Sequence, residues 1–450
     1  MAGGAVIRFV VPATGLSVLA LATFLWSHDR HAYFWFVTRF FPNPWDFPFL
    51  DLDYIPAAIA CWAKGVDVYV ANTCDSLSRA HDYSPLWLRA TFLPLERDWT
   101  PVYGLGLASL FCASLALLPR PGSWRDLRFI VPAALSSSTV YAVERGNVDL
   151  FLFLLAMAAA VLWTRAYALR LAAYALIVLA GLLKFYPLAA LAIQTRERPK
   201  AFAVALTLST VAIAACAMLF HDELRRMAPN IPAAGSPFTD LFGAAQLPGG
   251  FGRFARAGAH AMGFGGPALQ ALPENAVLKS ALAAGLFGGA ALIVVRLAFH
   301  ARLNDAFATL SPLETGQCAI AAWTICGCFV AGQSVAYRAV FLLPLLPVLL
   351  NLARFPGAGG ARTALRAAAW CIVGLMWWPG LRSLAGEGKF AEFAPPPEDL
   401  PNLLLWLVHE LAWWWLFAVL MGLLAVFVRQ SVLPRHLTFI PRAWLASPRF

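Results

Sequence analysis

Charged residues are scarce in this chain of 450 residues, where Asp, Glu, Lys and Arg together make up 13% of the sequence. A soluble domain usually carries about a quarter of such residues. Cysteine is sparse as well, with eight residues, and no long polar stretch separates one part of the chain from another. These absences exclude a disordered chain, a disulfide-stapled secreted domain and a soluble nucleic-acid-binding protein.

Hydrophobic residues are abundant instead, at 60% of the chain, and 17 Trp with 33 Phe exceed what one soluble core can bury. Apolar runs of about 17–25 residues can cross the hydrocarbon layer of a membrane. We therefore predict an all-α polytopic membrane protein with about ten to twelve transmembrane helices, residues 1–450 forming a single integral membrane domain. The runs lie near 6–26, 101–118, 129–143, 148–163, 171–183, 186–195, 201–220, 276–298, 314–334, 337–352, 367–380 and 401–428.

The positive charges indicate the orientation of the chain. Short loops and the tail 429–450, all expected on one side, carry 18 Lys and Arg with Arg8 included, against only four acids. Basic loops of this length stay in the cytoplasm, so both termini are expected there, in a bacterial inner membrane. The net charge of +10 is then topological, with anionic lipids rather than nucleic acid as its partner.

The N-terminal run has two interpretations. Arg8 precedes an apolar stretch that could be the core of a cleaved signal peptide. That stretch is about 18 residues long, whereas a signal core has about 7–15. We expect an uncleaved first helix.

The opposite, outer side then receives the long connecting segments, which are 27–100, 221–275 and 381–400. Loops of this length in a compact protein tend to be functional or disordered. Because the first combines five Trp with nine acids, we expect amphipathic helices within it. It also holds Cys61 and Cys74, which would form a disulfide in an oxidising compartment, two unpaired thiols being the alternative. The other six cysteines lie in apolar runs and are expected to be buried.

The first cluster of polar residues is in this outer loop, where Asp51 and Asp53 come just before an expected short helix at 55–63. A carboxylate near the bilayer surface can accept a proton from a hydroxyl. Asp53 is better placed to cap the helix at Ile55. In extended chain the two acids point the same way and would share one site.

The second cluster occupies the turn between two apolar runs and consists of Glu144, Arg145, Asn147 and Asp149. Asn147 follows a glycine and can cap a helix that begins at Val148. Charged groups at membrane depth normally face a protein cavity. A plain loop with a Glu144–Arg145 pair among lipid headgroups is the alternative.

Lys184 and Arg338 are single cations at the start of otherwise apolar segments. Pro187 would break the helix near Lys184 and free backbone groups. The alternative is that each cation extends to lipid phosphate. Together with Arg145 they would suit a bound phosphate, since Arg can donate to two oxygens at once. An acid at the surface with cations for a phosphate favours an enzyme that uses a lipid-linked phosphate donor.

At these residues the chain resembles glycosyltransferase family 87, whose members are polytopic enzymes of the GT-C fold. The resemblance is strongest over residues 45–200. Its motifs are Asp51, Ala57-Ala58, Gly65-Val66-Asp67-Val68-Tyr69, Tyr83-Ser84-Pro85, Gly146-Asn147, Lys184 with Pro187, and more loosely Tyr337-Arg338 with Pro344.

The resemblance implies a GT-C-like bundle and a specific reaction. Family members transfer a hexose, mannose-like in the actinobacterial enzymes, from a polyprenyl-phosphate donor to a lipid or glycan acceptor, with inversion and without a metal or other cofactor. By position the general base would be Asp51. Asp53 departs from the family pattern as a second acid, which leaves the assignment of the base open. Arg145, Lys184 and Arg338 would bind the donor phosphate, and Glu144, Asn147, Tyr83 and Tyr337 would support the site.

Three other functions stay open at this point. A transporter or flippase of lipid-linked glycans would have a similar number of helices, but no inverted repeat is visible. A structural subunit would use the long outer loops for binding. An envelope polysaccharide polymerase is favoured by paired loop arginines such as Arg225-Arg226.

Overall fold

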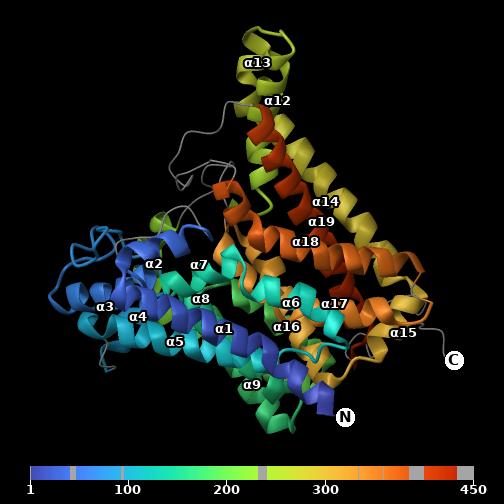
Figure 1. The fold of residues 1–450 in the computed structure, drawn as a ribbon, viewed down its shortest axis with the longest axis horizontal. Coiled ribbons are helices and arrows are strands. Elements are labelled where there is room, and N and C mark those ends of the chain that lie inside the picture. Colours follow the sequence, from blue (N-terminus) through green and yellow to red (C-terminus); the bar gives the residue numbers. More distant parts are fainter. Residues whose placement is uncertain are drawn as a thin grey trace.

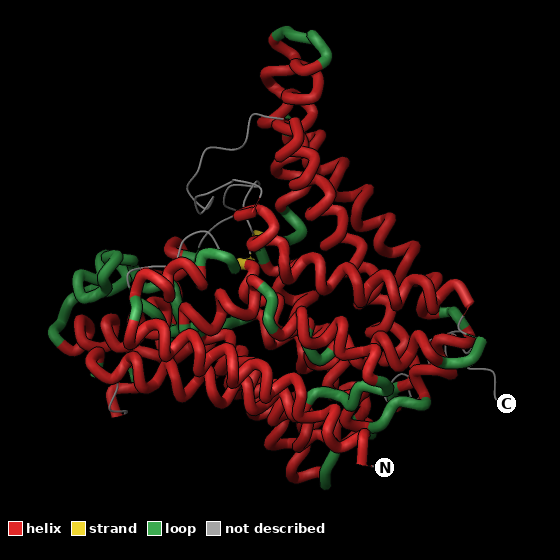
Figure 2. The backbone as a smooth tube through the Cα atoms, viewed as in Figure 1, coloured by secondary structure: helices red, strands yellow, loops and turns green. Residues whose placement is uncertain are grey.

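The structure is a computed structural model that describes residues 2–40, 47–92, 96–231, 241–332, 334–357, 359–384 and 400–432. Most of the expected loop 381–400, part of 221–275 and most of the tail 429–450 lie outside these residues. The described chain is helical almost throughout, with two short strands (Figure 2). The expected all-α membrane fold is confirmed.

Helices α1 to α10 are α1 (Ala2–His28), α2 (Arg30–Val37), α3 (Leu50–Ala63), α4 (Pro85–Leu88), α5 (Thr100–Ser114), α6 (Leu127–Ala134), α7 (Ser137–Arg145), α8 (Val148–Trp163), α9 (Tyr167–Leu183) and α10 (Pro199–Leu219). Helices α11 to α19 are α11 (His221–Met227), α12 (Gln246–Ala261), α13 (Pro267–Ala271), α14 (Ala276–Ala298), α15 (Ala301–Ala308), α16 (Pro312–Ala331), α17 (Leu345–Arg354), α18 (Gly359–Leu384) and α19 (Leu400–Gln430).

Tighter 3-10 segments connect these helices. They are η1 (Ala90–Phe92), η2 (Arg97–Trp99), η3 (Leu115–Leu117), η4 (Trp124–Asp126), η5 (Tyr186–Arg196), η6 (Ala228–Asn230), η7 (Leu272–Glu274) and η8 (Ala336–Leu342). Strands β1 (Leu241–Phe242) and β2 (Ser334–Val335) pair antiparallel, with Phe242 opposite Ser334.

Seven helices of the described chain are long and apolar enough to cross a membrane, namely α1, α5, α10, α14, α16, α18 and α19. Two bent pairs raise this to nine spans if each pair counts as one, and α9 is a shorter apolar helix. The pairs are α7 with α8, bent by 107°, and η8 with α17, bent by 45°. The expected ten to twelve runs therefore include pieces that are broken helices, such as 186–195, which forms η5.

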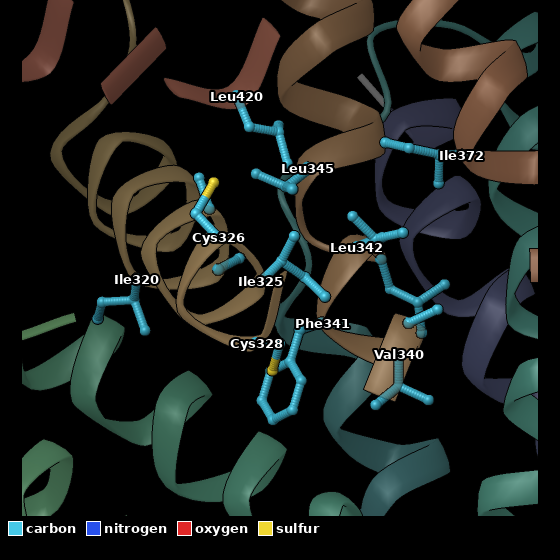
Figure 3. Packing of buried hydrophobic residues seen from close by; sticks show 14 of the residues in the cluster. Ile320, Ile325, Cys326, Cys328, Val340, Phe341, Leu342, Leu345, Ile372 and Leu420 are labelled. Atoms are coloured by element: carbon cyan, nitrogen blue, oxygen red, sulfur yellow. The ribbon is translucent and has the colours of Figure 1, made fainter. Parts of the chain in front are cut away.

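The buried core lies where α16, η8, α17, α18 and α19 meet. Figure 3 shows Ile325 of α16, Phe341 of η8 and Leu345 of α17 packed together, with Ile372 of α18 and Leu420 of α19 beside them. Helices α10 and α14 are mostly exposed by contrast, and their apolar surfaces are suited to lipid. The ends of α14 and α19 extend with α12 and α13 into an arm (Figure 1).

Local capping produces the sharp bend between α7 and α8. Gly146 follows the last residue of α7 with a φ of 57°, a left-handed conformation that favours glycine. Asn147 then begins α8, and its side-chain oxygen accepts a hydrogen bond from the backbone N–H of Asp149. This is the cap that the sequence predicts. The bend places Asn147 and Asp149 between the first loop and the core.

Candidate active site

Asn147 joins the start of α8 to the first loop. Its Oδ1 accepts from the Asp149 backbone N–H at 3.0 Å, and its Nδ2 donates to Oδ2 of Asp51 at 2.8 Å. The side chain is fully buried. The first loop and the α7–α8 bend, almost 100 residues apart in sequence, therefore meet at one point.

Asp51 lies in the first turn of α3 and is the more exposed of its two acids, with 13% of the side chain accessible. Its Oδ1 accepts from Nη1 of Arg79 at 3.1 Å. Arg79 is in turn held by Asp75, whose Oδ2 accepts from both the backbone N–H and Nε of Arg79. Burial lowers the pKa of Arg79, but the hydrogen bonds to Asp75 and the charge of Asp51 outweigh this and raise it above its ordinary value.

The expectation that Asp53 caps a helix at Ile55 is wrong, because α3 begins at Leu50. The backbone N–H of Phe49, the residue before the helix, donates to the carbonyl oxygen of Glu144 at 2.6 Å, a tertiary contact that no local pattern reveals. In a helix, residues two apart point to nearly opposite sides. The two acids therefore do not share one site.

Asp53 instead ties α3 to the segment before α5. Its carboxylate accepts two hydrogen bonds from Arg97, at 2.5 and 3.1 Å, and one from the hydroxyl of Thr100 at 3.3 Å. This bidentate geometry is typical of a structural ion pair.

Lys184 and Arg338 come together around a buried carboxylate. Lys184 Nζ lies 2.8 Å from Oδ1 of Asp149, and Arg338 Nε lies 3.6 Å from Oδ2. The hydroxyl of Tyr186 also donates to Asp149, at 2.6 Å. As the sequence predicts, α9 ends just before Lys184 and Pro187.

The role of Asp149 was not predicted from the sequence. The residue has no exposed surface and is shared by both cations, which leaves the three side chains with one net positive charge when all are ionised. The sequence does show an acid that follows an expected helix cap at the start of an apolar run, but this pattern does not reveal the partners of the acid. Only the fold shows which cations reach it.

Aromatic rings line the cations. Lys184 Nζ lies 5.2 Å from the ring centre of Tyr83 and 5.6 Å from that of Tyr337. Tyr337 contacts Tyr141, with ring centres 5.5 Å apart. The guanidinium of Arg145 lies 5.3 Å from the ring centre of Tyr141. The third expected phosphate ligand, Arg145, is thus linked to Lys184 through two tyrosines.

Glu144 lies beside Arg145, with 3.5 Å between its Oε2 and the arginine Nε, and both side chains are buried. The alternative interpretation of the sequence was this same pair in a plain loop among lipid headgroups. Burial shows that the pair belongs to the protein interior instead.

Asp82 is a second acid near the cations. Burial raises its pKa, and the positive charge of Lys184 partly opposes that shift. Its Oδ1 accepts from the hydroxyl of Tyr54 at 3.2 Å. Burial also raises the pKa of the adjacent Tyr83, and the negative charges of Asp51, Asp82 and Asp149 contribute to this shift.

The loop around the site is cross-linked. Cys61 and Cys74 form a disulfide, with Cα atoms 5.8 Å apart. Arg226 donates a hydrogen bond to Asp67 at 3.1 Å and so packs on this loop. It belongs to the Arg225-Arg226 pair that was the argument for a polysaccharide polymerase. Among the described residues, no three His, Cys, Asp or Glu side chains gather as metal ligands would.

The arrangement has a defined chemical capacity. Asn147 contacts both the partly exposed carboxylate of Asp51 and the ammonium of Lys184, and Lys184 and Asp51 interact electrostatically. A carboxylate can take a proton from an attacking hydroxyl. Nearby cations can stabilise an anionic leaving group. A carboxylate that can act as a base, placed near cations, suits a reaction in which an alcohol displaces a phosphate.

Comparison with protein families matches residues 85–313 to the model of glycosyltransferase family 87. No curated protein and no solved structure matches the chain. The matched range includes Asn147, Asp149 and Lys184, and it overlaps the range of the sequence resemblance from residue 85 to residue 200.

Proposed function

Because the chain belongs to glycosyltransferase family 87, and is thus a multi-pass membrane glycosyltransferase, we propose that it transfers a hexose from a polyprenyl-phosphate donor to a lipid or glycan acceptor. The sugar is mannose-like in this proposal. The reaction takes place on the outer face of a bacterial inner membrane, with both chain termini in the cytoplasm.

One observation carries the proposal, which is the placement of Asp51 beside the cluster of Asp149, Lys184 and Arg338. The cluster keeps one positive charge after Asp149 is counted. The cluster would therefore attract a phosphate monoanion or dianion without carrying a large excess of positive charge. The aromatic rings around Lys184 exclude water and strengthen that attraction.

In the proposed mechanism the acceptor hydroxyl attacks the anomeric carbon of the donor sugar. As the new carbon–oxygen bond forms, Asp51 takes the hydroxyl proton and the bond from the anomeric carbon to the phosphate oxygen breaks. The phosphate leaves with the electron pair and is stabilised by Lys184 and Arg338. This single displacement inverts the anomeric configuration.

Other residues support these steps. Asn147 and Arg79 hold the two oxygens of Asp51, and each oxygen keeps a lone pair for the acceptor. Arg145 adds positive charge behind Tyr141 and Tyr337. Since the cations carry the charge of the leaving group, no metal or other cofactor is part of the proposal.

The donor class is tested with purified protein in lipid, a panel of labelled polyprenyl-phosphate sugars, and labelled nucleotide sugars as the matched comparison. Membrane extract supplies the acceptor. We expect transfer from one or more polyprenyl-phosphate sugars and inhibition by unlabelled polyprenyl phosphate. Transfer from a nucleotide sugar alone, or no transfer and no donor hydrolysis, would contradict the proposal.

A further inference from the structure

A basic cavity of about 710 Å³ lies where α6, α17 and α18 pack together (Figure 1). Four arginines from separate segments line it, namely Arg125, Arg128, Arg354 and Arg366. Helix α17 leads away from η8, which carries Arg338, and ends at Arg354. Helices α6 and α7 likewise lead from Arg128 to Arg145. The cavity therefore lies at the opposite end of these helices from the candidate active site.

Only part of this positive charge is neutralised within the protein. Nη1 of Arg354 donates to both oxygens of Asp126, at 2.6 and 2.8 Å. Asp126 is the one acid among the described residues that line the cavity, so four arginines against one acid leave an excess of three positive charges. In the described part of the chain, Arg125, Arg128 and Arg366 form no ion pair. Such an excess attracts an anion, and a phosphate has enough oxygens to accept from several arginines at once.

The rest of the cavity wall is apolar. Phe129, Leu350 and Ala353 line it and are buried, whereas Trp124 and Trp370 line it with 55% and 56% of their surface exposed. The rings of Phe129 and Trp370 are in contact, with centres 4.5 Å apart. A free phosphate would fill a small part of this volume and would leave the apolar side chains against water. An amphiphile uses both parts of the wall.

Helix α18 places the cavity at the surface of the bilayer. The helix is long and apolar enough to cross a membrane. Arg366 and Trp370 are four residues apart on it and so share one face. An exposed Trp on a membrane-spanning helix faces lipid, and Trp is enriched where the membrane meets water. Arg366, about 6 Å nearer the start of the helix, then lies at the depth of the lipid phosphates.

We propose that the cavity binds the headgroup of an anionic phospholipid. Its phosphate contacts the three arginines that Asp126 does not neutralise, and the first atoms of its chains cover the apolar wall. Basic pockets between transmembrane helices are suited to anionic headgroups. The site is separate from the proposed donor site, and the inference does not rest on the proposed function.

The test measures dissociation constants of lipids from the purified full-length protein by native mass spectrometry. The probes are phosphatidylglycerol and, as the neutral lipid, phosphatidylcholine. Arg128→Gln/Arg366→Gln removes two of the three charges, and Arg125→Gln/Arg366→Gln is a second cavity variant in case the first fails to fold. The matched control is Arg165→Gln/Arg198→Gln, which removes two exposed arginines that do not line the cavity.

For the wild type we expect one phosphatidylglycerol to bind at least tenfold more tightly than phosphatidylcholine. Each cavity variant should bind phosphatidylglycerol at least tenfold more weakly, with its affinity for phosphatidylcholine unchanged. The control should match the wild type for both lipids, because it loses the same amount of charge outside the cavity. Inorganic phosphate at the same concentration should not displace the bound phosphatidylglycerol.

Four results would overturn the inference. Equal affinities of the wild type for the two lipids would exclude an anionic headgroup, and an equal loss in the control would assign the binding to net charge alone. Displacement by inorganic phosphate would identify a soluble anion as the ligand. Tighter binding of polyprenyl phosphate than of phosphatidylglycerol, lost in the cavity variants, would assign the cavity to a prenyl lipid. None of these measurements involves sugar transfer, so a failure here is distinguishable from a failure of the proposed function.

Discussion

At the scale of single residues, the site depends on a carboxylate that two cations share. Asp149→Asn would leave Lys184 and Arg338 repelling each other in a buried place. We expect a loss of about 3 kcal/mol or more in stability, as for other broken buried pairs, together with loss of transfer. Thermal unfolding in lipid nanodiscs measures the stability.

The control for that variant is Asp305→Asn, whose carboxylate is 42% exposed and 3.7 Å from Arg302. Exposed pairs contribute about 0–1 kcal/mol, so its melting temperature should stay close to that of the wild type. Equal melting temperatures for Asp149→Asn and Asp305→Asn would show that the buried cluster does not hold the core together.

His81 gives the first loop a pH dependence. Its buried ring packs between Tyr54 and Tyr69, and burial lowers its pKa to about 4. Below pH 6.5 the unfolded chain binds a proton that the folded chain does not yet bind, so stability falls as the pH drops towards 4. Below pH 4, where the ring is protonated in both the folded and the unfolded chain, the loss of stability levels off at about 3 kcal/mol, which corresponds to the difference between the two pKa values.

The measurement compares the melting temperatures of the wild type and His81→Phe between pH 7 and pH 5. The variant keeps an aromatic ring and removes the titration, so its curve should be flatter. An identical decline in both proteins would assign the pH dependence to other groups.

At the scale of elements, the start of α3 is fixed by close packing across two glycines. A Cβ on Gly104 of α5 would lie 2.3 Å from the ring of Phe49, and one on Gly146 would lie 3.2 Å from the Phe49 Cβ. Gly104→Ala should therefore displace the first turn of α3 and with it Asp51. We expect about 1–3 kcal/mol of destabilisation and slower transfer.

The same helix offers the matched control. A Cβ on Gly106 would meet nothing within 4 Å, and Ala is the better helix former. Gly106→Ala should keep full stability and activity, as seen in melting temperature and transfer rate. If Gly104→Ala behaved like Gly106→Ala, Phe49 would not be what positions the base.

Some helix boundaries could be predicted from the sequence and others could not. The cap at Asn147 and the helix end before Pro187 follow from local backbone chemistry, and both were predictable. The start of α3 at Leu50 depends on a hydrogen bond from Phe49 to Glu144, almost 100 residues away. A local pattern carries no information about such a contact, which is why the pairing of Asp51 with Asp53 was wrong.

At the scale of the whole molecule, composition was enough to predict an all-α membrane protein, because the hydrophobic runs leave few alternatives. The meeting of three distant segments at Asp149 was not predictable, since it depends on how bent and broken helices pack. Arg79 was missed for a related reason. It lies in an irregular loop and is aimed at Asp51 by Asp75.

The orientation of the molecule can be tested through its disulfide. If the first loop lies on the outer face, Cys61 and Cys74 are oxidised in the cell. Thiol titration of the denatured protein should then give six free thiols before reduction and eight after it. Eight thiols before reduction would place this loop in a reducing compartment and contradict the proposed orientation.

The proposed mechanism depends on Asp51 as the general base. The most direct test is the kcat of Asp51→Asn with its polyprenyl-phosphate sugar donor, beside the control Asp98→Asn at an exposed position of the same loop. General-base catalysis contributes about 10²–10⁴-fold, so we predict a loss of that size with donor binding and melting temperature unchanged. A folded Asp51→Asn enzyme that transfers sugar at the wild-type rate would contradict this mechanism.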